Sequence, residues 1–378
     1  MTNLLQSVQD AVAGHAERHR PTGFGFALAE SVSQLDAAAW DGLTEHSSFF
    51  LSRRYLQALE AAAPANLSPR CALLYEGRRP VAAVSCQLVK VKAARLLVAG
   101  NLASWGQHAA AFAPGLDPAE LWPGVAEALY RIRRSEKLSG RTDFVLIKDL
   151  PADDHGAAAL RRFGYRPIAT DPDMVLELRP EWKDFAGYLG GLQSKYRSSI
   201  KGVAKKLDAA GCRVAAIADV EAAAPHLHAL YRQVLEASNI HPVELPAGYW
   251  PAMAAAAGPD LRMTGITRDG TLLGFQATVK DGDTAVGYYL GYERTLRDEL
   301  PLYFRLLHSN IEAAFDWGCK RVSFGRTCLE PKAQLGAKPV PTNLWARHPN
   351  PLVNGVVRTL FGAVPHGEAP ERDPFKVC

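Results

Sequence analysis

The feature that most constrains the fold is a run of three apolar strands joined by tight turns, which occurs twice in the sequence. In the second half it spans residues 260–293, with turns at Arg-Asp-Gly and Lys-Asp-Gly-Asp. Aspartate and glycine suit such turns because they tolerate the backbone angles that tight hairpins require. In the first half the strand patterns fall at 70–76, 81–89 and 94–100, and a Gly-Arg-Arg-Pro turn follows the first of them. The sequence therefore predicts two antiparallel meanders.

Helical patterns flank both meanders in the same order. The expected helices are 33–43, 52–63, 117–134, 182–207, 221–237, 300–318 and 351–362, and the expected further strands are 24–30, 142–150, 211–218, 320–325 and 343–348. This amounts to a coarse internal repeat of roughly 180 residues. We predict an α/β protein with mixed sheets, made of two domains at 1–180 and 181–378 around a shared cleft.

The composition fits such a protein and argues against several other classes. Of the 378 residues, 48% are hydrophobic and 22% are charged, which favours a folded globular chain. The net charge of +4 does not by itself indicate a nucleic-acid partner. The six cysteines are scattered and form no C-x-x-C pair, so we expect neither a disulfide framework nor a metal site. With no apolar segment long enough for a membrane span and no signal-peptide pattern, we expect a cytoplasmic protein.

A stripe of cations lies on the long helical pattern 182–207. Arg197, Lys201 and Lys205 recur every four residues, so they share one face beside the apolar seam. Such a stripe can bind phosphate groups of a nucleotide, of a lipid-linked substrate or of a tRNA acceptor stem. The alternative is a solvated helix face, which is the usual place for charged residues.

The segment 324–339, FGRTCLEPKAQLGAKP, combines backbone-bending residues with cations. Arg326 and Lys332 follow a strand that reads as buried, and we predict a loop that covers an active site. A fixed cation in such a loop can stabilise a bound anionic group or negative charge that develops in a reaction. The alternative is that Arg326 and Lys332 are solvated loop cations. Cys328 lies in the same loop, and we interpret it as structural.

Polar side chains on and near the second meander are further candidates. Gln276 and Tyr289 lie on its central strands, where they could contact a substrate or carry a proton. Packing is the more common role of strand tyrosines. His241 lies in the loop SNIHPVE and could act as a base near neutral pH, although a loop histidine is more often simply exposed.

The order of elements resembles two copies of the GNAT acyltransferase fold, joined as in FemAB-like and BioF2-like proteins. That branch includes peptidoglycan aminoacyltransferases. The motifs that carry the resemblance are HSSFFLSRRYLQALEAA (46–62), LQSKYRSSIKGVAKKLDAAGCRV (192–214), GTLLGFQATVKDGDTAVGYYLGYE (270–293) and AAFDWGCKRVSFGRTCLEPKAQLGAKP (313–339). Together these stretches extend over most of the chain.

The sequence departs from the GNAT pattern at one important place. GNAT enzymes usually bind the CoA pyrophosphate with a Q/R-x-x-G-x-G/A loop before the helix that follows the meander. The corresponding stretch here, YERTLRDELPLYF (292–304), has no glycine. Glycine permits close approach of phosphate to backbone amides, so the departure argues against ordinary acetyl-CoA binding. FemAB-like aminoacyltransferases also lack this loop.

The resemblance implies an N-acyltransferase whose active site lies in the C-terminal domain, with a supporting N-terminal domain that is not catalytic. The acceptor would be a primary amine of a small or cell-envelope-type molecule. No cofactor is bound tightly, and the co-substrate is acyl-CoA or aminoacyl-tRNA. In the tRNA reading, Arg197, Lys201 and Lys205 contact the acceptor stem. A third reading is a non-catalytic module that binds a cell-wall or polysaccharide precursor.

Overall fold

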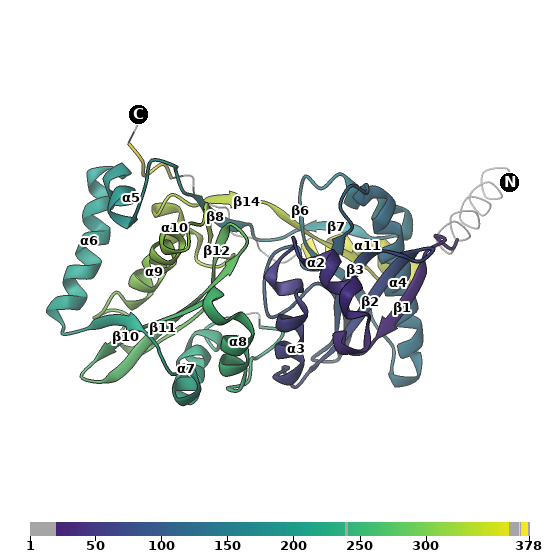
Figure 1. The fold of residues 1–378 in the computed structure, drawn as a ribbon, viewed down its shortest axis with the longest axis horizontal. Coiled ribbons are helices and arrows are strands. Elements are labelled where there is room, and N and C mark those ends of the chain that lie inside the picture. The colour runs from purple at the N-terminus through teal and green to yellow at the C-terminus, as the bar shows by residue number, and fades with distance from the viewer. Residues whose placement is uncertain (1–19, 239–240, 363–369, 371, 377–378) are drawn as a thin grey trace. The chain divides into compact units, whose positions relative to one another are not determined.

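The computed structural model describes residues 20–238, 241–362, 370 and 372–376 (Figure 1). The chain divides into two compact units. Unit 1 holds the described residues of Met1–Ser47, Asn66–Thr170 and Asn343–Pro365, and unit 2 holds those of Ser48–Ala65, Asp171–Thr342 and His366–Cys378. Both units are therefore discontinuous in sequence. The continuous domains 1–180 and 181–378, and the shared cleft between them, stay predictions.

Unit 1 is built on one mixed sheet. Its strands are β1 (Gly25–Ala29), β2 (Leu67–Glu76), β3 (Arg79–Val91), β4 (Ala94–Ala99), β5 (Ala110–Phe112), β6 (Phe144–Pro151), β7 (Arg166–Ala169) and β15 (Thr342–Arg347). They are ordered β1-β2-β3-β4-β6-β15-β7, and β5 pairs with β3. The predicted meander forms β2, β3 and β4 with antiparallel pairing. β6 then pairs with β4 in parallel.

The helices of unit 1 include one long amphipathic helix. The helical elements are α2 (Ala37–Thr44), α4 (Pro118–Ser135), α11 (Pro351–Gly362), and the 3₁₀ helices η1 (Val32–Gln34), η3 (Glu136–Ser139) and η4 (Gly156–Phe163). Asp117 caps α4 by accepting a hydrogen bond from the Ala119 amide. The apolar face of α4, centred on the fully buried Trp122, covers the sheet and forms the core with residues such as Leu74 and Val84. Burying each such side chain contributes about 2 kcal/mol.

Unit 2 has a second mixed sheet. Its strands are β8 (Asp173–Glu177), β9 (Arg213–Ala216), β10 (Leu261–Arg268), β11 (Thr271–Asp281), β12 (Thr284–Tyr292), β13 (Arg321–Ser323) and β14 (Lys338–Val340). They are ordered β14-β8-β13-β12-β11-β10-β9. The second predicted meander forms β10, β11 and β12 with antiparallel pairing. Two mixed sheets in tandem confirm the predicted fold class.

Helices cover both faces of the unit 2 sheet. They are α3 (Arg53–Ala61), α5 (Phe185–Gly191), α6 (Ser194–Ala209), α7 (Val220–Leu235), α8 (Tyr249–Ala257), α9 (Leu302–Asp316) and α10 (Leu329–Gln334), with the 3₁₀ helices η2 (Phe49–Leu51), η5 (Gly258–Asp260) and η6 (Arg294–Leu296). Figure 1 shows α6 and α9 on one side of the sheet and α7 and α8 on the other. α9 buries Leu306 and Ile311, which belong to the cores beneath it.

The single long helix predicted at 182–207 is wrong, because the chain breaks it into α5 and α6. Leu192 adopts extended backbone angles, with φ −78° and ψ 147°, and ends α5. The Trp182 indole packs against Gly191, where a Cβ would lie 2.7 Å from its Nε1 atom. Glycine at this position therefore lets the tryptophan close the end of α5.

The segment 324–339 is also more ordered than the predicted loop. It contains α10 and β14, and β14 pairs with β8. Residues 1–22, whose sequence predicts a polar lead-in helix or arm, lie almost entirely outside the described residues. None of the helices in the described part of the chain is both long and apolar enough to cross a lipid bilayer.

Candidate active site

In unit 2 two parallel strands pair briefly and then separate. β12 pairs with β13 from Thr284↔Arg321 to Val286↔Ser323, where β13 ends. β12 continues to Tyr292. Within the described chain, residues 287–292 therefore have a strand beside them only on the β11 edge.

A β-bulge lies where the strands separate. On β11, Ala277 pairs with Tyr289 and Thr278 pairs with Gly287, which leaves Tyr288 as an extra residue in β12. A bulge bends its strand and increases the local twist. The bulge therefore accounts for the divergence of β12 from β13.

The bulge also places two successive tyrosines on one face of the sheet. The Tyr289 ring centroid lies 5.6 Å from that of Tyr231 on α7 and 6.1 Å from that of Trp250 on α8. The Tyr288 ring lies 4.7 Å from Tyr289. Side chains of successive strand residues normally point to opposite faces, so this arrangement depends on the bulge.

Three buried tyrosine hydroxyls meet beneath the bulge. The Tyr288 oxygen lies 2.5 Å from that of Tyr249 and 3.2 Å from that of Tyr55, and Tyr249 donates to Tyr55 at 3.4 Å. Burial and the neighbouring tyrosines raise the pKa of Tyr288 well above its ordinary value. Burial likewise raises the pKa of the half-buried Tyr289. At neutral pH these groups are protonated, so Tyr289 can donate a proton or a hydrogen bond but is a poor base.

A buried network fixes the chain where it leaves β13. Asp173 accepts hydrogen bonds from the Ser323 hydroxyl at 2.7 Å and from the Gly325 amide at 2.9 Å. The Lys332 ammonium donates to the Gly325 carbonyl at 3.0 Å and is 3% exposed. Burial lowers the pKa of Lys332 to about 8, against the opposing effect of Asp173. Lys332 is thus turned inward, and its catalytic role stays a prediction.

Tyr303 of α9 contacts residues that follow both diverging strands. Its ring centroid lies 6.1 Å from that of Tyr292, the last residue of β12. Its hydroxyl is hydrogen-bonded to the thiol of Cys328, in the segment that follows β13. Arg326 belongs to this segment, and its Nη2 donates to the Thr342 hydroxyl at 3.2 Å. The predicted substrate-binding role of Arg326 stays a prediction.

The loop between β12 and α9 is occupied by its own side chains. The Glu293 carboxylate accepts hydrogen bonds from the Thr295 amide at 3.2 Å and from the Thr295 hydroxyl at 2.8 Å. Gln233 of α7 accepts a bond from the Arg294 amide at 3.0 Å and donates to Glu293. A carboxylate therefore lies at the backbone amides that follow the meander, and it would repel a phosphate there.

Gln276 and His241 lie in different surroundings. Gln276 is 1% exposed, and its amide donates to the carbonyls of Ala277 and Tyr289 at 2.8 and 3.2 Å. Its Oε1 is buried and has no hydrogen-bond partner among the described residues. His241 is exposed, and its Nδ1 lies 3.1 Å from the Ser238 carbonyl. The structure thus joins Gln276 to Tyr289 but shows no contact of His241 with either.

The predicted cationic stripe lies on α6. Lys201 and Lys205 are exposed, and Arg197 donates to the Leu192 carbonyl at 3.3 Å. The other side of α6 borders a small hollow of about 30 Å³ that α9 and α10 also line. Binding roles for Arg197, Lys201 and Lys205 stay predictions.

In unit 1 the position equivalent to the opening is filled by the chain itself. β4 and β6 pair from Leu96↔Phe144 to Ala99↔Ile147, and the β3–β4 register contains no bulge. The next residue on β6, Lys148, donates to the carbonyls of Asn101 and Ser104 at 2.9 and 2.7 Å and to the Asp149 carboxylate. The loop after β4 is thereby tied across the end of the strand pair.

Several of these contacts were not predicted from the sequence. Asp173 is not among the candidate residues predicted from the sequence, and Glu293 belongs only to the stretch without glycine. A usable signal was present for the bulge, since two successive tyrosines interrupt the alternation expected of a half-buried strand. Within the described residues no cluster of three or more His, Cys, Asp or Glu side chains could hold a metal.

Comparison with known proteins places these features in a fold family. Residues 194–333 match the model of the Acetyltransferase (GNAT) domain. The whole chain is similar in structure to FemX, with a TM-score of 0.56 and 12% identity over 88% of this chain and 100% of that one. A tandem GNAT protein from the clavulanic acid biosynthesis pathway gives a TM-score of 0.55 and 16% identity over 87% and 99%. A search of curated protein sequences gave no match.

The chain therefore has the tandem GNAT fold predicted from its sequence. The likeness to FemX, at 12% identity, is a likeness of fold.

Proposed function

We propose that the protein is an N-acyltransferase that moves an acyl or aminoacyl group from an activated donor to a primary amine. Unit 2 carries the reaction in this proposal, and unit 1 does not. The observation that carries it is the separation of β12 from β13 at the Tyr288 bulge, within the segment that matches the acetyltransferase model.

The free edge of β12 suits a donor that contains amide groups. Beyond Val286 the backbone N–H and C=O groups on that edge have no neighbouring strand in the described chain. An extended ligand with amides can add to such an edge through main-chain hydrogen bonds. Both the pantetheine arm of CoA and an aminoacyl or peptidyl group contain suitable amides.

In the proposed reaction the amine nitrogen attacks the carbonyl carbon of the donor directly. A C–N bond forms, the C–S or C–O bond to the leaving group breaks, and the amine loses one proton while the leaving group gains one. In this proposal Tyr289, which is protonated at neutral pH, donates to the carbonyl oxygen or to the leaving atom. Water or His241 would take the proton from the amine.

We assign Lys332 and Gln276 supporting roles in this reaction. Lys332 holds the Gly325 carbonyl, so it positions the segment that carries Arg326. Gln276 donates to the Tyr289 carbonyl and so fixes the backbone at the bulge. Arg326 is then the cation that contacts substrate.

One observation favours aminoacyl-tRNA over acyl-CoA as the donor. The Glu293 carboxylate occupies the amides after β12, where GNAT enzymes usually place the CoA pyrophosphate. The exposed Lys201 and Lys205 on α6, with Arg197, would bind the phosphates of an acceptor stem. In favour of acyl-CoA, the tandem GNAT protein of similar fold is described in a form without AcCoA, so AcCoA is the ligand considered for that protein.

The test is transfer of a radiolabelled group to a panel of primary amines, with acetyl-CoA or a charged tRNA pool as donor. We expect turnover with one donor, and salt-sensitive turnover if the donor is tRNA. Lys332→Ala and Arg326→Ala should each reduce turnover, whereas Arg78→Gln on an exposed turn of unit 1 should not. Full turnover in both site variants would overturn the assigned roles. Ligand binding with no transfer from any donor would favour the non-catalytic binding module.

A further inference from the structure

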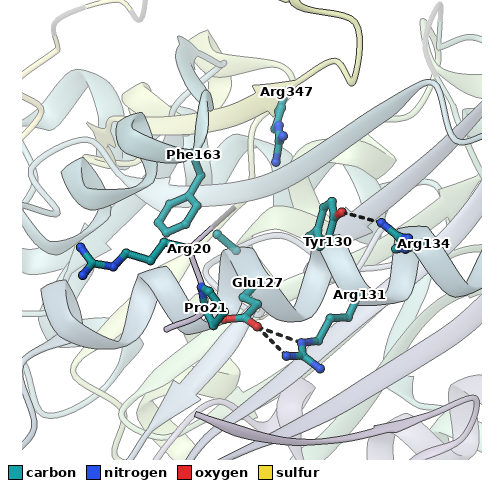
Figure 2. Close-up of a pocket in the computed structure, with 9 residues that line it drawn as sticks. Arg20, Pro21, Glu127, Tyr130, Arg131, Arg134, Phe163 and Arg347 are labelled. Carbon is teal, nitrogen blue, oxygen red and sulfur yellow. Dashed lines mark hydrogen bonds and ion pairs between the residues drawn. The ribbon is translucent and has the colours of Figure 1, made fainter. Parts of the chain in front are cut away.

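A hollow on unit 1 collects arginines from three distant parts of the sequence. It has a volume of about 320 Å³, and Figure 2 shows its lining. The lining residues are Arg20, Pro21, Ala126, Glu127, Tyr130, Arg131, Arg134, Phe163 and Arg347. We call it the arginine pocket. The lining thus contains four arginines and one glutamate.

Local structure explains how these residues meet. Glu127, Tyr130, Arg131 and Arg134 follow helical spacing, so they form one outward stripe on α4, opposite its buried face. β15 pairs with β7 through Ala346↔Arg166, which carries Arg347 to the position beside Tyr165. The Arg347 guanidinium carbon lies 6.0 Å from the centroid of the Tyr165 ring.

Among the described residues that line the pocket, Glu127 is the one carboxylate, and both of its oxygens already accept hydrogen bonds. Glu127 Oε2 accepts bonds from the Thr22 amide at 2.8 Å and from the Thr22 hydroxyl at 2.6 Å. Its Oε1 accepts two bonds from Arg131, at 3.0 and 2.7 Å. Burial alone would raise the pKa of Glu127, but these donors outweigh it and lower the pKa. Glu127 and Arg131 therefore neutralise each other, so Glu127 does not neutralise Arg134 or Arg347.

Positive charge is crowded around Arg134 and Arg347. Arg134 donates to the Tyr130 hydroxyl at 3.1 Å, a neutral partner. Arg347 is hydrogen-bonded to the hydroxyl of Tyr165, which is also neutral. Arg133, whose guanidinium lies 5.5 Å from the Tyr130 ring centroid, is close enough to Arg347 that burial and this like charge lower its pKa. Guanidinium groups held together against neutral partners favour a bound anion.

We propose that the arginine pocket binds the phosphate monoester or pyrophosphate group of a small molecule. Arg134 and Arg347 supply two forks that match phosphate oxygens, and a phosphate monoester carries close to two negative charges at neutral pH. A ligand with a single carboxylate group would leave one of these two guanidinium groups without an anionic partner. The Tyr130 and Phe163 rings give the rest of the molecule an apolar surface. A hollow rather than an extended stripe favours a terminal phosphate over a nucleic-acid backbone.

This site is independent of the proposed acyl transfer. Its residues belong to α4, to the chain before β1, and to the ends of η4 and β15, all in unit 1. None belongs to the β12 and β13 segments of unit 2. A failure of the acyl-transfer assay therefore does not bear on the arginine pocket, whose own test is a binding measurement.

The experiment is calorimetric titration of the full chain with sodium pyrophosphate, inorganic phosphate and a short RNA hairpin that has no terminal phosphate. We expect saturable binding of pyrophosphate or phosphate at 0.1 M salt, where exposed charges are largely screened. Arg347→Gln and Arg134→Gln should each weaken it by about tenfold or more, since each removes a charge-assisted contact. Arg78→Gln, which removes an equal charge from an exposed turn of the same unit, should leave it unchanged.

Arg134 is exposed, so Arg134→Gln keeps the test valid even if Arg347→Gln disturbs Tyr165 and the fold. An equal loss of binding in Arg78→Gln would mean that binding depends on the total positive charge of the unit and not on the pocket, and it would overturn the proposal. Binding of the RNA hairpin without binding of either phosphate probe would also overturn it, and so would the absence of any binding.

Discussion

Two parallel strand pairs, β4 with β6 in unit 1 and β12 with β13 in unit 2, differ in the path of the chain beyond their last paired residues. β4 has a regular register and stops, and its loop folds back to meet Lys148. β12 carries the Tyr288 bulge and continues to Tyr292 without a partner on the β13 edge in the described chain. The strand pair with a regular register, β4 with β6, thus ends closed, whereas the pair with one extra residue, β12 with β13, ends open.

A buried lysine lies at each of these ends, and the two lysines hold different segments of the chain. Lys148 binds the loop that fills the position after β4. Lys332 binds the Gly325 carbonyl and so holds the segment after β13. We infer that the same structural device closes one unit and shapes a site in the other.

The largest expected effect comes from Lys148→Met. The change leaves the Asp149 carboxylate, which is 2% exposed, without its ammonium partner. Removing one partner of a buried ion pair costs about 3–5 kcal/mol. Native-state hydrogen exchange should show this loss in β4 and β6 of unit 1 but not in β11 and β12 of unit 2. Unchanged protection of β4 and β6 would contradict the role of Lys148 in closing unit 1, and Arg78→Gln serves as the control.

The next effect is a pH dependence of Lys332. In the unfolded chain this lysine titrates near 10.5, and in the fold its pKa is about 8. Between these values the unfolded state binds more protons, so raising the pH favours the folded state. The unfolding free energy of the wild type, minus that of Lys332→Met, should therefore rise by up to about 3 kcal/mol from pH 8 to 10.5. A difference that stays flat with pH would show that burial does not shift this group.

Tyr289→Phe should reduce turnover without unfolding unit 2. Loss of a hydrogen-bond or proton donor to the reacting group costs about 10- to 100-fold in rate. Steady-state kinetics with the active donor measure it, and Tyr75→Phe in unit 1 is the matched loss of a hydroxyl. Equal rates for the wild type and Tyr289→Phe would remove this tyrosine from the mechanism.

The smallest effect is expected for Tyr288→Phe. It removes one hydroxyl from the three that meet beneath the bulge, while Tyr55 and Tyr249 keep each other as partners. We expect a loss of about 1 kcal/mol in the stability of β12, measured by hydrogen exchange. A loss several times larger would mean that the bulge itself depends on this hydroxyl.

Local patterns predicted most elements of the fold. The turns Arg-Asp-Gly and Lys-Asp-Gly-Asp predicted the hairpins of β10, β11 and β12, and the structure confirms them. The prediction of one long helix at 182–207 was wrong because periodicity does not reveal a tertiary contact such as the packing of Trp182 against Gly191. The order of strands in the unit 1 sheet was not predicted, because β15 lies between β6 and β7 although it is far from both in sequence.

For the candidate site, residue type was easier to predict than orientation. The sequence predicts Lys332 as a cation of a loop that covers an active site, with a solvated loop cation as the alternative, and α10 turns its ammonium inward to the Gly325 carbonyl. Gly325, which accepts the Lys332 hydrogen bond, is itself held by Asp173, and Asp173 lies more than a hundred residues earlier in the chain. Such long-range contacts leave no local pattern in a sequence.

The discontinuous path of the chain has a consequence for its synthesis on the ribosome. β15, at residues 342–347, lies between β6 and β7 in the sheet of unit 1. A nascent chain emerges at about 5–20 residues per second, so the first unit to emerge waits tens of seconds for an interior strand. During that wait the facing edges of β6 and β7 lack the strand that pairs with both, and an unpaired strand edge can pair with other chains.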